Sequence, residues 1–213
     1  GNTMIDSLLA HKARAVSPET TIARAGFDSR VVTGPAGFGV VTLHRPSNVD
    51  SRESFADAVA VLTDVAQRIP LVWPVHPRAR ANIDNFGLAA TLRGAAITLL
   101  DPQGYLEMLG LMAAARLVLT DSGGIQEETT ALAVPCLTMR ENTERPITVI
   151  QGTNTLVGRD RMRVRECVDA ILQTGGKRGR IPELWDGRTA ERIAADLESW
   201  LAEPSTAPER RVA

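Results

Sequence analysis

Short apolar runs recur along this chain, and a stretch with helical spacing follows nearly every one. The runs are Val40–Leu43, Pro70–Val75, Ala96–Leu100, Leu117–Leu119, Pro135–Met139 and Asn154–Val157. The stretches expected to be helical are Glu53–Arg68, Ala79–Leu88, Gln103–Ala115, the segments that start at Ile125 and at Pro146, Arg161–Gln173 and Thr189–Leu201. Strands of this length that alternate with helices pair in parallel, because each helix carries the chain back across the sheet. The pattern predicts an α/β fold with a doubly wound parallel sheet.

The segments that flank this alternation have a different character. Asn2–Arg14 predicts a helix that begins at an Asn2 or Thr3 cap. Ala15–Gly39 is rich in Pro, Thr and Gly, and we expect an irregular connector there. We therefore expect a linker helix and connector over 1–36, the sheet domain over 37–202, and a disordered tail over 203–213.

The stretch LVLTDSGGIQEE, Leu117–Glu128, predicts a strand, a tight loop and the start of a helix. Glycines let a ligand approach the backbone closely, and the first-turn N–H groups of a helix attract phosphate. Ser122 offers a hydroxyl, and Glu128 lies further along the helix, where it could accept bonds from sugar hydroxyls. Alternatively, Ser122 caps the helix and the glycines only turn the chain. GxxxxGK[ST] is absent and no GxGxxG follows a strand, so a nucleotide-sugar or phosphosugar fits as well as a nucleoside triphosphate or a dinucleotide.

Polar side chains follow the predicted strands, where the carboxyl edge of a parallel sheet binds ligands. They are His44, Arg45, His76, Arg78, Asp101, Asp121, Ser122 and the segment Arg140–Arg145. Arginine suits phosphate oxygens, and histidine can exchange a proton near neutral pH. In the alternative interpretation the histidines cap strand ends, and Arg140 and Arg145 pair with Glu141 and Glu144. The Gly-rich loop Gly175–Gly179 follows no strand, and we interpret it as a surface turn.

Charge and composition exclude several classes of function. A formal net charge of −1 argues against general affinity for nucleic acid or an anionic membrane. The two cysteines, Cys136 and Cys167, are too few for a disulfide framework or a metal cluster, and Cys136 is interpreted as a core residue. His44 and His76 lack the spacing of a zinc helix, so no metal site is predicted. With no long apolar run and no signal-peptide pattern, a cytoplasmic protein is expected.

Six motifs occur in an order that resembles a known family. They are HRPSNVD (His44–Asp50), PVHPR (Pro74–Arg78), DPQGYLEMLGLM (Asp101–Met112), TDSGGIQEE (Thr120–Glu128), MRENTERP (Met139–Pro146) and GTNTLVG (Gly152–Gly158). Together they resemble the non-hydrolysing UDP-N-acetylglucosamine 2-epimerases. The resemblance implies a GT-B architecture, with this chain equivalent to its Rossmann-like C-terminal domain. It also implies UDP elimination to 2-acetamidoglucal and re-addition with C2 inverted, without nicotinamide or metal.

The resemblance also implies roles for single residues. The diphosphate would lie on Ser122, Gly123 and Gly124, and the ribose on Glu128. His44 would be the catalytic residue at the cleft, with His76 near a second, regulatory UDP-sugar. The remaining contacts with the nucleotide would come from Arg45, Arg140, Arg145 and, where relatives can carry an aromatic residue against uracil, Met108.

The family's acid and base residues lie in an N-terminal domain, and the opening GNTMID (Gly1–Asp6) resembles the linker after that domain. Each such group contributes roughly 10²–10⁴-fold, so we expect this chain alone to bind UDP weakly and to turn over little. A homodimer, or a partner chain that supplies the missing half, is expected. The alternatives are a GT-B glycosyltransferase domain, a hydrolysing epimerase, and a non-catalytic UDP-sugar-binding subunit.

Overall fold

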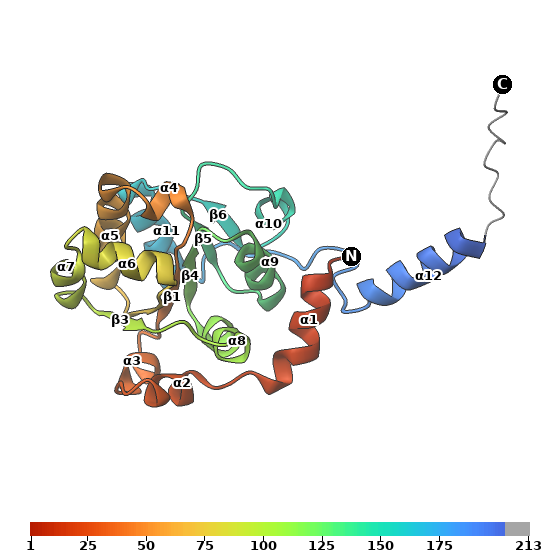
Figure 1. Ribbon diagram of the computed structural model, residues 1–213, viewed down its shortest axis with the longest axis horizontal. Helices are drawn as coiled ribbons and strands as arrows, with labels where there is room; N and C mark the ends of the chain where they lie inside the picture. The colour runs from red at the N-terminus through yellow and green to blue at the C-terminus, as the bar shows by residue number, and fades with distance from the viewer. Residues whose placement is uncertain (203–213) are drawn as a thin grey trace, which may run out of the picture.

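A six-stranded, all-parallel sheet with the order β3-β2-β1-β4-β5-β6 forms the centre of the protein (Figure 1). The computed structural model describes residues 1–202. Its strands are β1 Gly39–Thr42, β2 Leu71–Pro74, β3 Ile97–Leu100, β4 Leu117–Thr120, β5 Cys136–Thr138 and β6 Asn154–Leu156. Every strand predicted from the sequence is confirmed, and so is the parallel pairing. The order reverses between β1 and β4, which places the switch point of the sheet there.

Helices connect the strands and cover both faces of the sheet, which confirms the doubly wound α/β fold. They are α1 Thr3–His11, η1 Lys12–Arg14, α2 Pro18–Arg24, α3 Arg30–Thr33, α4 Pro46–Val49, α5 Arg52–Ala66, α6 Pro77–Asn85, α7 Ala89–Arg93, α8 Tyr105–Ala114, α9 Gly123–Leu132, α10 Pro146–Ile150, α11 Arg161–Thr174 and α12 Thr189–Ala202. Side-chain caps begin several of them. Asn2 accepts from the Met4 N–H at the start of α1, and Asp160 accepts at the start of α11.

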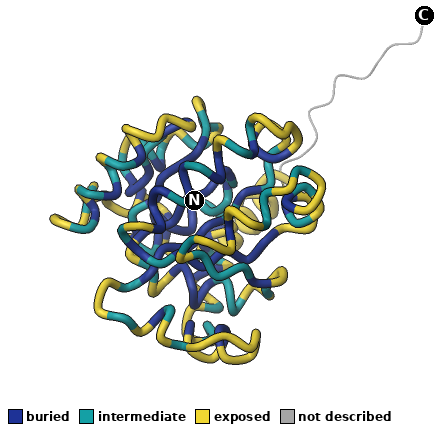
Figure 2. Tube along the Cα trace, turned by 90° about the vertical axis from the view of Figure 1, so that its left-hand side faces the viewer, coloured by how far each residue is buried: buried dark blue, intermediate teal, exposed yellow. Residues whose placement is uncertain are grey.

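The buried stretches of the chain lie in the interior of the protein (Figure 2), and the apolar core has two layers, one on each face of the sheet. Helices α5, α6, α7 and α11 pack on one face, where Phe55 meets Trp73 edge to face with ring centroids 6.3 Å apart. Helices α2, α3 and α8 pack on the other. Helix α1 adds a smaller cluster beside α8 and α9, in which Ile5 and Leu8 are fully buried. Full burial of one such side chain stabilises the fold by about 1.5–3 kcal/mol.

Apart from α4, which was not predicted, two helical segments differ from the prediction. Ala15–Gly39 is not irregular throughout, because it contains α2 and α3. Ser17 caps α2 by accepting from the Thr20 N–H at 3.2 Å, and burial of Ile22 holds the helix against α8. The predicted helix Ala79–Leu88 starts earlier and ends at Asn85, and a left-handed Gly87 (φ 71°) then leads into α7. In both cases Pro at the first helical position marked a start that the apolar spacing alone did not show.

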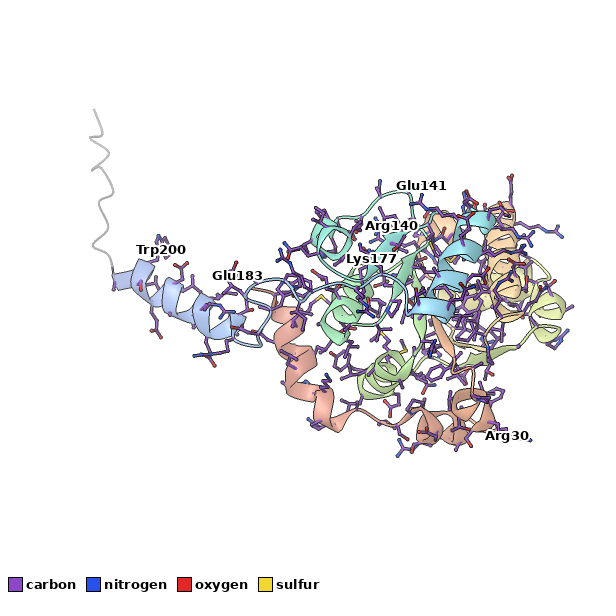
Figure 3. All side chains as sticks on the ribbon, turned by 180° about the vertical axis from the view of Figure 1, so that it is seen from behind. Arg30, Arg140, Glu141, Lys177, Glu183 and Trp200 are labelled. Atoms are coloured by element: carbon purple, nitrogen blue, oxygen red, sulfur yellow. The ribbon has the colours of Figure 1, made fainter. Side chains whose placement is uncertain are left out.

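Helix α12 lies apart from the rest of the protein (Figures 1 and 3). Among its described residues, Thr189 alone is buried, whereas Ile193, Leu197 and Trp200 are exposed. Its first turn is held by two hydrogen bonds, from Asn2 N to Thr189 Oγ1 (2.8 Å) and from Ala190 N to Asp6 Oδ2 (2.8 Å). Within residues 1–202, no helix combines the length and apolarity that a membrane span requires. The tail predicted over 203–213 lies outside the described residues.

Candidate functional site

The loop between β4 and α9 leaves the beginning of α9 open. Ser122 stands at the N-cap position, but among the described residues its side chain makes no capping hydrogen bond. The alternative in which Ser122 caps the helix is therefore wrong. Thr120 shapes the turn instead, since its hydroxyl accepts from Ser122 N at 3.0 Å and lies 2.6 Å from the hydroxyl of Thr42 on β1. The first-turn N–H groups of α9 and the Ser122 hydroxyl remain available for an anion.

Asp121 is a fully buried carboxylate that ties β4 to the residues after β1. It accepts hydrogen bonds from the backbone N–H groups of His44 (3.0 and 3.1 Å) and Arg45 (2.9 Å), and from Asn48 Nδ2 (3.1 Å). Burial alone would raise the pKa of Asp121, but the hydrogen bonds from His44, Arg45 and Asn48 bring that pKa below its usual value. Asp121 is therefore an ionised, immobile anchor.

The same carboxylate orients the ring of His44. His44 Nδ1 lies 3.0 Å from Asp121 Oδ1, and the side chain is 39% exposed. Because a carboxylate only accepts, Nδ1 carries a hydrogen and Nε2 is the ring atom left to accept or exchange a proton. Asp121 thereby selects one tautomer of a half-exposed histidine.

The structure brings His76 beside His44, with ring centroids 5.5 Å apart. His76 Nδ1 accepts from the Arg78 N–H at 3.2 Å, so this ring caps the beginning of α6, whereas the alternative interpretation placed such a cap at a strand end. The neutral His76 ring consequently carries its hydrogen on Nε2. The two rings present opposite hydrogen-bonding character at the same edge of the sheet.

A glutamate from the loop after β5 lies over the start of α9 and joins two arginines. Glu144 Oε1 is 2.7 Å from Arg45 Nη2, and Glu144 Oε2 is 2.7 Å from Arg140 Nη2. The Oε1 atom also lies 2.7 Å from the point where a Cβ on Gly123 would stand. The Arg140 guanidinium, with Arg45 beside it, lowers the pKa of Glu144 to about 2, so this carboxylate is ionised at neutral pH.

Arg140 and Glu144 therefore form an ion pair as the alternative interpretation predicted, whereas Arg145 and Glu141 do not pair within this loop. Arg145 Nε lies 3.2 Å from Glu127 Oε1, without the angle of a hydrogen bond. Glu141 instead lies against Gly158, and it makes no ion pair within residues 1–202. The loop is thus tied to α9 and to the loop after β1, and it is not simply solvated.

Glu128, on the second turn of α9, is a buried acid with one side-chain partner. It is 5% exposed and accepts a hydrogen bond from Tyr105 Oη at 3.2 Å. Burial raises the pKa of Glu128 and outweighs the opposing effect of the Tyr105 hydrogen bond. Burial, together with Glu128, raises the pKa of Tyr105 to about 12. Met108, one turn further along α8, is half-buried and packs against the apolar cluster of α2, α3 and α8.

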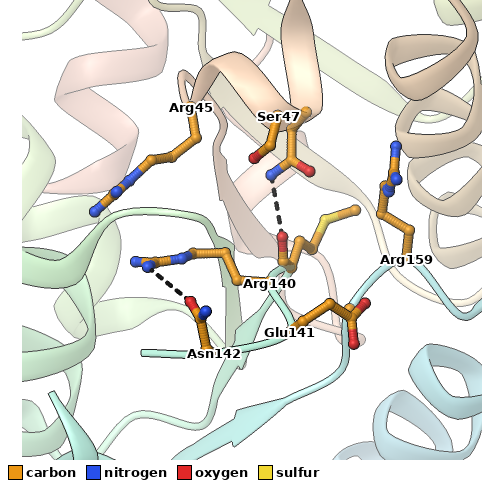
Figure 4. Close-up of a pocket in the computed structure, with 9 residues that line it drawn as sticks. Arg45, Ser47, Arg140, Glu141, Asn142 and Arg159 are labelled. Atoms are coloured by element: carbon orange, nitrogen blue, oxygen red, sulfur yellow. Dashed lines mark hydrogen bonds between the residues drawn. The ribbon is translucent and has the colours of Figure 1, made fainter. Parts of the chain in front are cut away.

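A cavity of about 280 Å³ opens beside this site (Figure 4). It lies at the carboxyl ends of β1, β5 and β6, and Asn48 Nδ2 supports its wall by donating to Met139 O at 3.0 Å. Its lining is Arg45, Ser47, Asn48, Met139, Arg140, Glu141, Asn142, Gly158 and Arg159. The two arginines that hold Glu144 thus also line this cavity, whereas Ser122, Gly123, Gly124 and Glu128 lie outside it.

Two other sequence interpretations can be compared with the structure. Burial raises the pKa of Cys136 to about 11, so its thiol stays neutral, in agreement with a core residue. In the Gly175–Gly179 loop, Gly175 ends α11 in the left-handed conformation, as a turn requires. Lys177 Nζ donates to the Asn154 and Val149 carbonyls, so the loop is tied to the end of the sheet. No cluster suitable for a metal occurs among residues 1–202.

Sequence reasoning did not assign roles to Asp121, Asn48 and Tyr105. Asp121 and Asn48 stand in motifs 73 residues apart, and they meet because β1 pairs with β4. The sequence pattern predicted a parallel sheet without its strand order, so it could not pair these residues. Tyr105 could have been found from its place at the start of α8, one turn before Met108.

Known proteins resemble this chain over most of its length. A family model for UDP-N-acetylglucosamine 2-epimerase matches residues 1–198. The UDP-N-acetylglucosamine 2-epimerase of Methanocaldococcus jannaschii is 37% identical over 200 residues, which are 92% of this chain and 53% of that protein. The UDP-2,3-diacetamido-2,3-dideoxy-D-glucuronate 2-epimerase of Pseudomonas aeruginosa is 39% identical over 173 residues, which are 81% and 44% respectively.

Solved structures of this family also resemble the chain. The Methanocaldococcus jannaschii UDP-GlcNAc 2-epimerase in complex with UDP-GlcNAc and UDP is similar with a TM-score of 0.79 and 34% identity. That likeness covers 93% of this chain and 54% of that one. The chain spans about half the length of the curated relatives it matches.

Proposed function

The chain belongs to the UDP-N-acetylglucosamine 2-epimerase family, and on that premise we propose that it binds the UDP part of a UDP-sugar at the β4–α9 loop. The observation that carries this proposal is the open beginning of α9 with a buried glutamate one turn further along the same helix. An anion and a hydroxylated ring can then bind side by side on one rigid element.

The diphosphate would accept hydrogen bonds from the first-turn N–H groups of α9 and from the Ser122 hydroxyl. Arg45 and Arg140 would supply positive charge from the loops after β1 and β5. Glu128 would accept hydrogen bonds from the ribose hydroxyls on its ionised carboxylate, with Tyr105 fixing one of its oxygens. We propose that Met108 contacts the uracil base and that Arg145 contacts the nucleotide from the loop after β5.

His44 would act in the chemical steps at the sugar. With Nδ1 held by Asp121, its Nε2 can accept a proton and, once protonated, donate a hydrogen bond to the bridging phosphate oxygen as UDP leaves C1. The relatives are about twice as long, and we propose that residues in their other half supply the acid and base at C2. His76 would contact a second, regulatory UDP-sugar.

The identity of the sugar is a separate question. One relative is named for UDP-N-acetylglucosamine and another for a UDP-diacetamido-glucuronate, at similar identity to this chain. The first sugar is our principal candidate, and the second is the alternative that this likeness favours. Competition of the two UDP-sugars against UDP would rank them, and product analysis would separate epimerisation from hydrolysis.

Calorimetric titration with UDP tests the proposal. The wild type should bind saturably, and Ser122→Ala with Glu128→Ala should weaken binding by at least about a hundredfold, since hydrogen bonds to charged groups contribute about 1.5–3 kcal/mol each. The matched control carries Ser199→Ala with Glu198→Ala on α12, and it should bind as the wild type does. A folded wild type that does not bind UDP would refute the proposal.

The isolated chain should catalyse little or no epimerisation, because groups essential at C2 would lie outside it. Incubation with UDP-N-acetylglucosamine and chromatographic analysis of the sugars tests this. Turnover at the rate of a full-length relative would contradict it.

A further inference from the structure

Three elements converge on the Glu144 carboxylate. Arg45 comes from the loop after β1 and donates to Glu144 Oε1 at 2.7 Å, and Arg140 comes from the loop after β5 and forms an ion pair with Glu144 Oε2 at 2.7 Å. The carboxylate lies against Gly123, the first residue of α9. Positive charge and a helix N-terminus are the groups to which a phosphate binds. A carboxylate that belongs to the chain already pairs with both arginines and lies beside the beginning of α9.

We propose that Glu144 and a ligand diphosphate compete for Arg45, Arg140 and the approach to α9, so that the diphosphate binds by displacing this carboxylate. The inference rests on the proposed nucleotide site and adds a mechanism of regulation to it. The geometry favours the competition, because Glu144 Oε1 stands 2.7 Å from the position of a Gly123 Cβ and so takes up space next to the backbone at the start of α9. Glu144 is 40% exposed, so its side chain can swing outward into solvent.

Because of this competition, the affinity of the site depends on the charge of the ligand. Two guanidinium groups with one carboxylate leave a single net positive charge, which attracts monovalent anions weakly and a diphosphate more strongly. Because the pKa of Glu144 is about 2, the competing charge persists across the physiological pH range. A ligand without phosphate does not need the arginines, and Glu144 leaves its affinity unchanged.

Glu144→Gln removes the competing charge and nearly preserves the shape of the side chain. Titrated with UDP and with inorganic pyrophosphate, this variant should bind each about tenfold more tightly than the wild type. That factor corresponds to the release of two surface ion pairs. Uridine, which carries no phosphate, should bind both proteins within about twofold. Glu141→Gln is the matched control, since it removes the same charge from the same loop without breaking an ion pair, and it should stay within about twofold for all three ligands.

Weaker or unchanged pyrophosphate binding by a folded Glu144→Gln variant would overturn the inference, because Glu144 would then orient the arginines for the ligand and not oppose it. The circular dichroism spectrum checks folding. If both proteins bind pyrophosphate and the variant binds it more tightly, while neither binds UDP, the competition stands and the nucleotide assignment fails. If neither protein binds pyrophosphate or UDP, both fail.

Discussion

Asp121 is the residue on which the geometry at the edge of the sheet depends most. It is fully buried, and its hydrogen bonds reach His44, Arg45 and Asn48. Asp121 cannot be replaced by a side chain that donates hydrogen bonds, because the N–H groups that face its carboxylate would then lose their acceptor. Its effect on the chemistry is indirect, through the tautomer and orientation of His44.

Asp121→Asn should lower the free energy of unfolding by about 2–4 kcal/mol, since an amide leaves buried donors unpaired at about 1–3 kcal/mol each. Urea denaturation measures this change. Nitrogen-15 NMR of the ring should also show that His44 no longer holds its hydrogen on Nδ1 alone. Asp101→Asn is the control, because that side chain is 93% exposed, and it should change stability by less than about 0.5 kcal/mol. A variant at Asp121 as stable as the control would contradict the assignment.

Glu128 should make UDP binding sensitive to mild acid. Its pKa is raised above 4.5, so it takes up a proton at a higher pH than an exposed glutamate, and the protonated form accepts ribose hydroxyls less well. UDP affinity should therefore fall as the pH decreases toward 5. Glu128→Gln should bind more weakly at pH 8 and lack this step.

Calorimetry between pH 5 and 8 measures both proteins. The phosphate of UDP also titrates, near a pKa of about 6, but it does so identically for the two, so the difference between the profiles isolates Glu128. Parallel profiles would show that Glu128 does not contact the nucleotide in its charged form.

The two ends of α9 differ in how their backbone is terminated. Its beginning is open, whereas its C-cap, Ala133, adopts the left-handed conformation with φ 57°. Glycine is the residue that occupies this position without strain, and Gly175 does so at the end of α11 with φ 84°. The helix that carries the proposed site thus ends on a strained residue.

Ala133→Gly should raise the free energy of unfolding by about 0.5–1 kcal/mol, since relief of about 1–2 kcal/mol of strain exceeds the entropy that glycine adds to the unfolded chain. Gly175→Ala should lower it by a similar amount. A Cβ at Gly175 would meet nothing within 4 Å, so its effect comes from the backbone alone. Urea denaturation of both variants tests this pair, and changes of the same sign would contradict the explanation.

The elements could be predicted from the sequence more completely than their contacts. Apolar periodicity located every strand, because a strand buried on both faces leaves a continuous apolar run such as Leu117–Leu119. It missed α2, whose signals are the Ser17 cap and Pro18. The polar edge was predicted correctly because all parallel strands end on one side. The pairs His44–Asp121 and Arg45–Glu144 could not be predicted, since they depend on strand order and on loops 77 and 99 residues apart in sequence.

At the scale of the whole molecule, the two terminal helices contribute very differently to stability. Helix α1 buries Ile5 and Leu8 completely against α8, α9 and Trp185. Helix α12 extends away from the protein, and its Trp200 is 68% exposed (Figure 3). The apolar core is therefore closed by the beginning of the chain.

Deletion of residues 1–11 should cost several kcal/mol of unfolding free energy, because removal of each buried aliphatic side chain costs about 2–5 kcal/mol. Deletion from Glu191 onward should cost less than about 1 kcal/mol, since among residues 191–202 it removes two exposed ion pairs, Arg192 with Asp186 and Glu191 with Arg188, and little burial. Urea denaturation of the two truncated proteins compares them. Equal losses would mean that α12 packs on the protein more closely than it does here.

The pairing of β1 with β4 at the switch point also affects when, during folding, the residues at the carboxyl edge of the sheet come together. The hydroxyls of Thr42 and Thr120 meet across 78 residues of sequence, and Asp121 reaches His44 across 77. We expect that strands β1, β2 and β3 can pair before β4 does. Asp121 can orient His44 only after β4 has paired with β1. Contacts between distant residues form late, because the closing of the loop costs entropy before any contact repays it. We therefore expect affinity for a nucleotide to appear only after β1 and β4 have paired, so that a bound nucleotide would report that this pairing has formed.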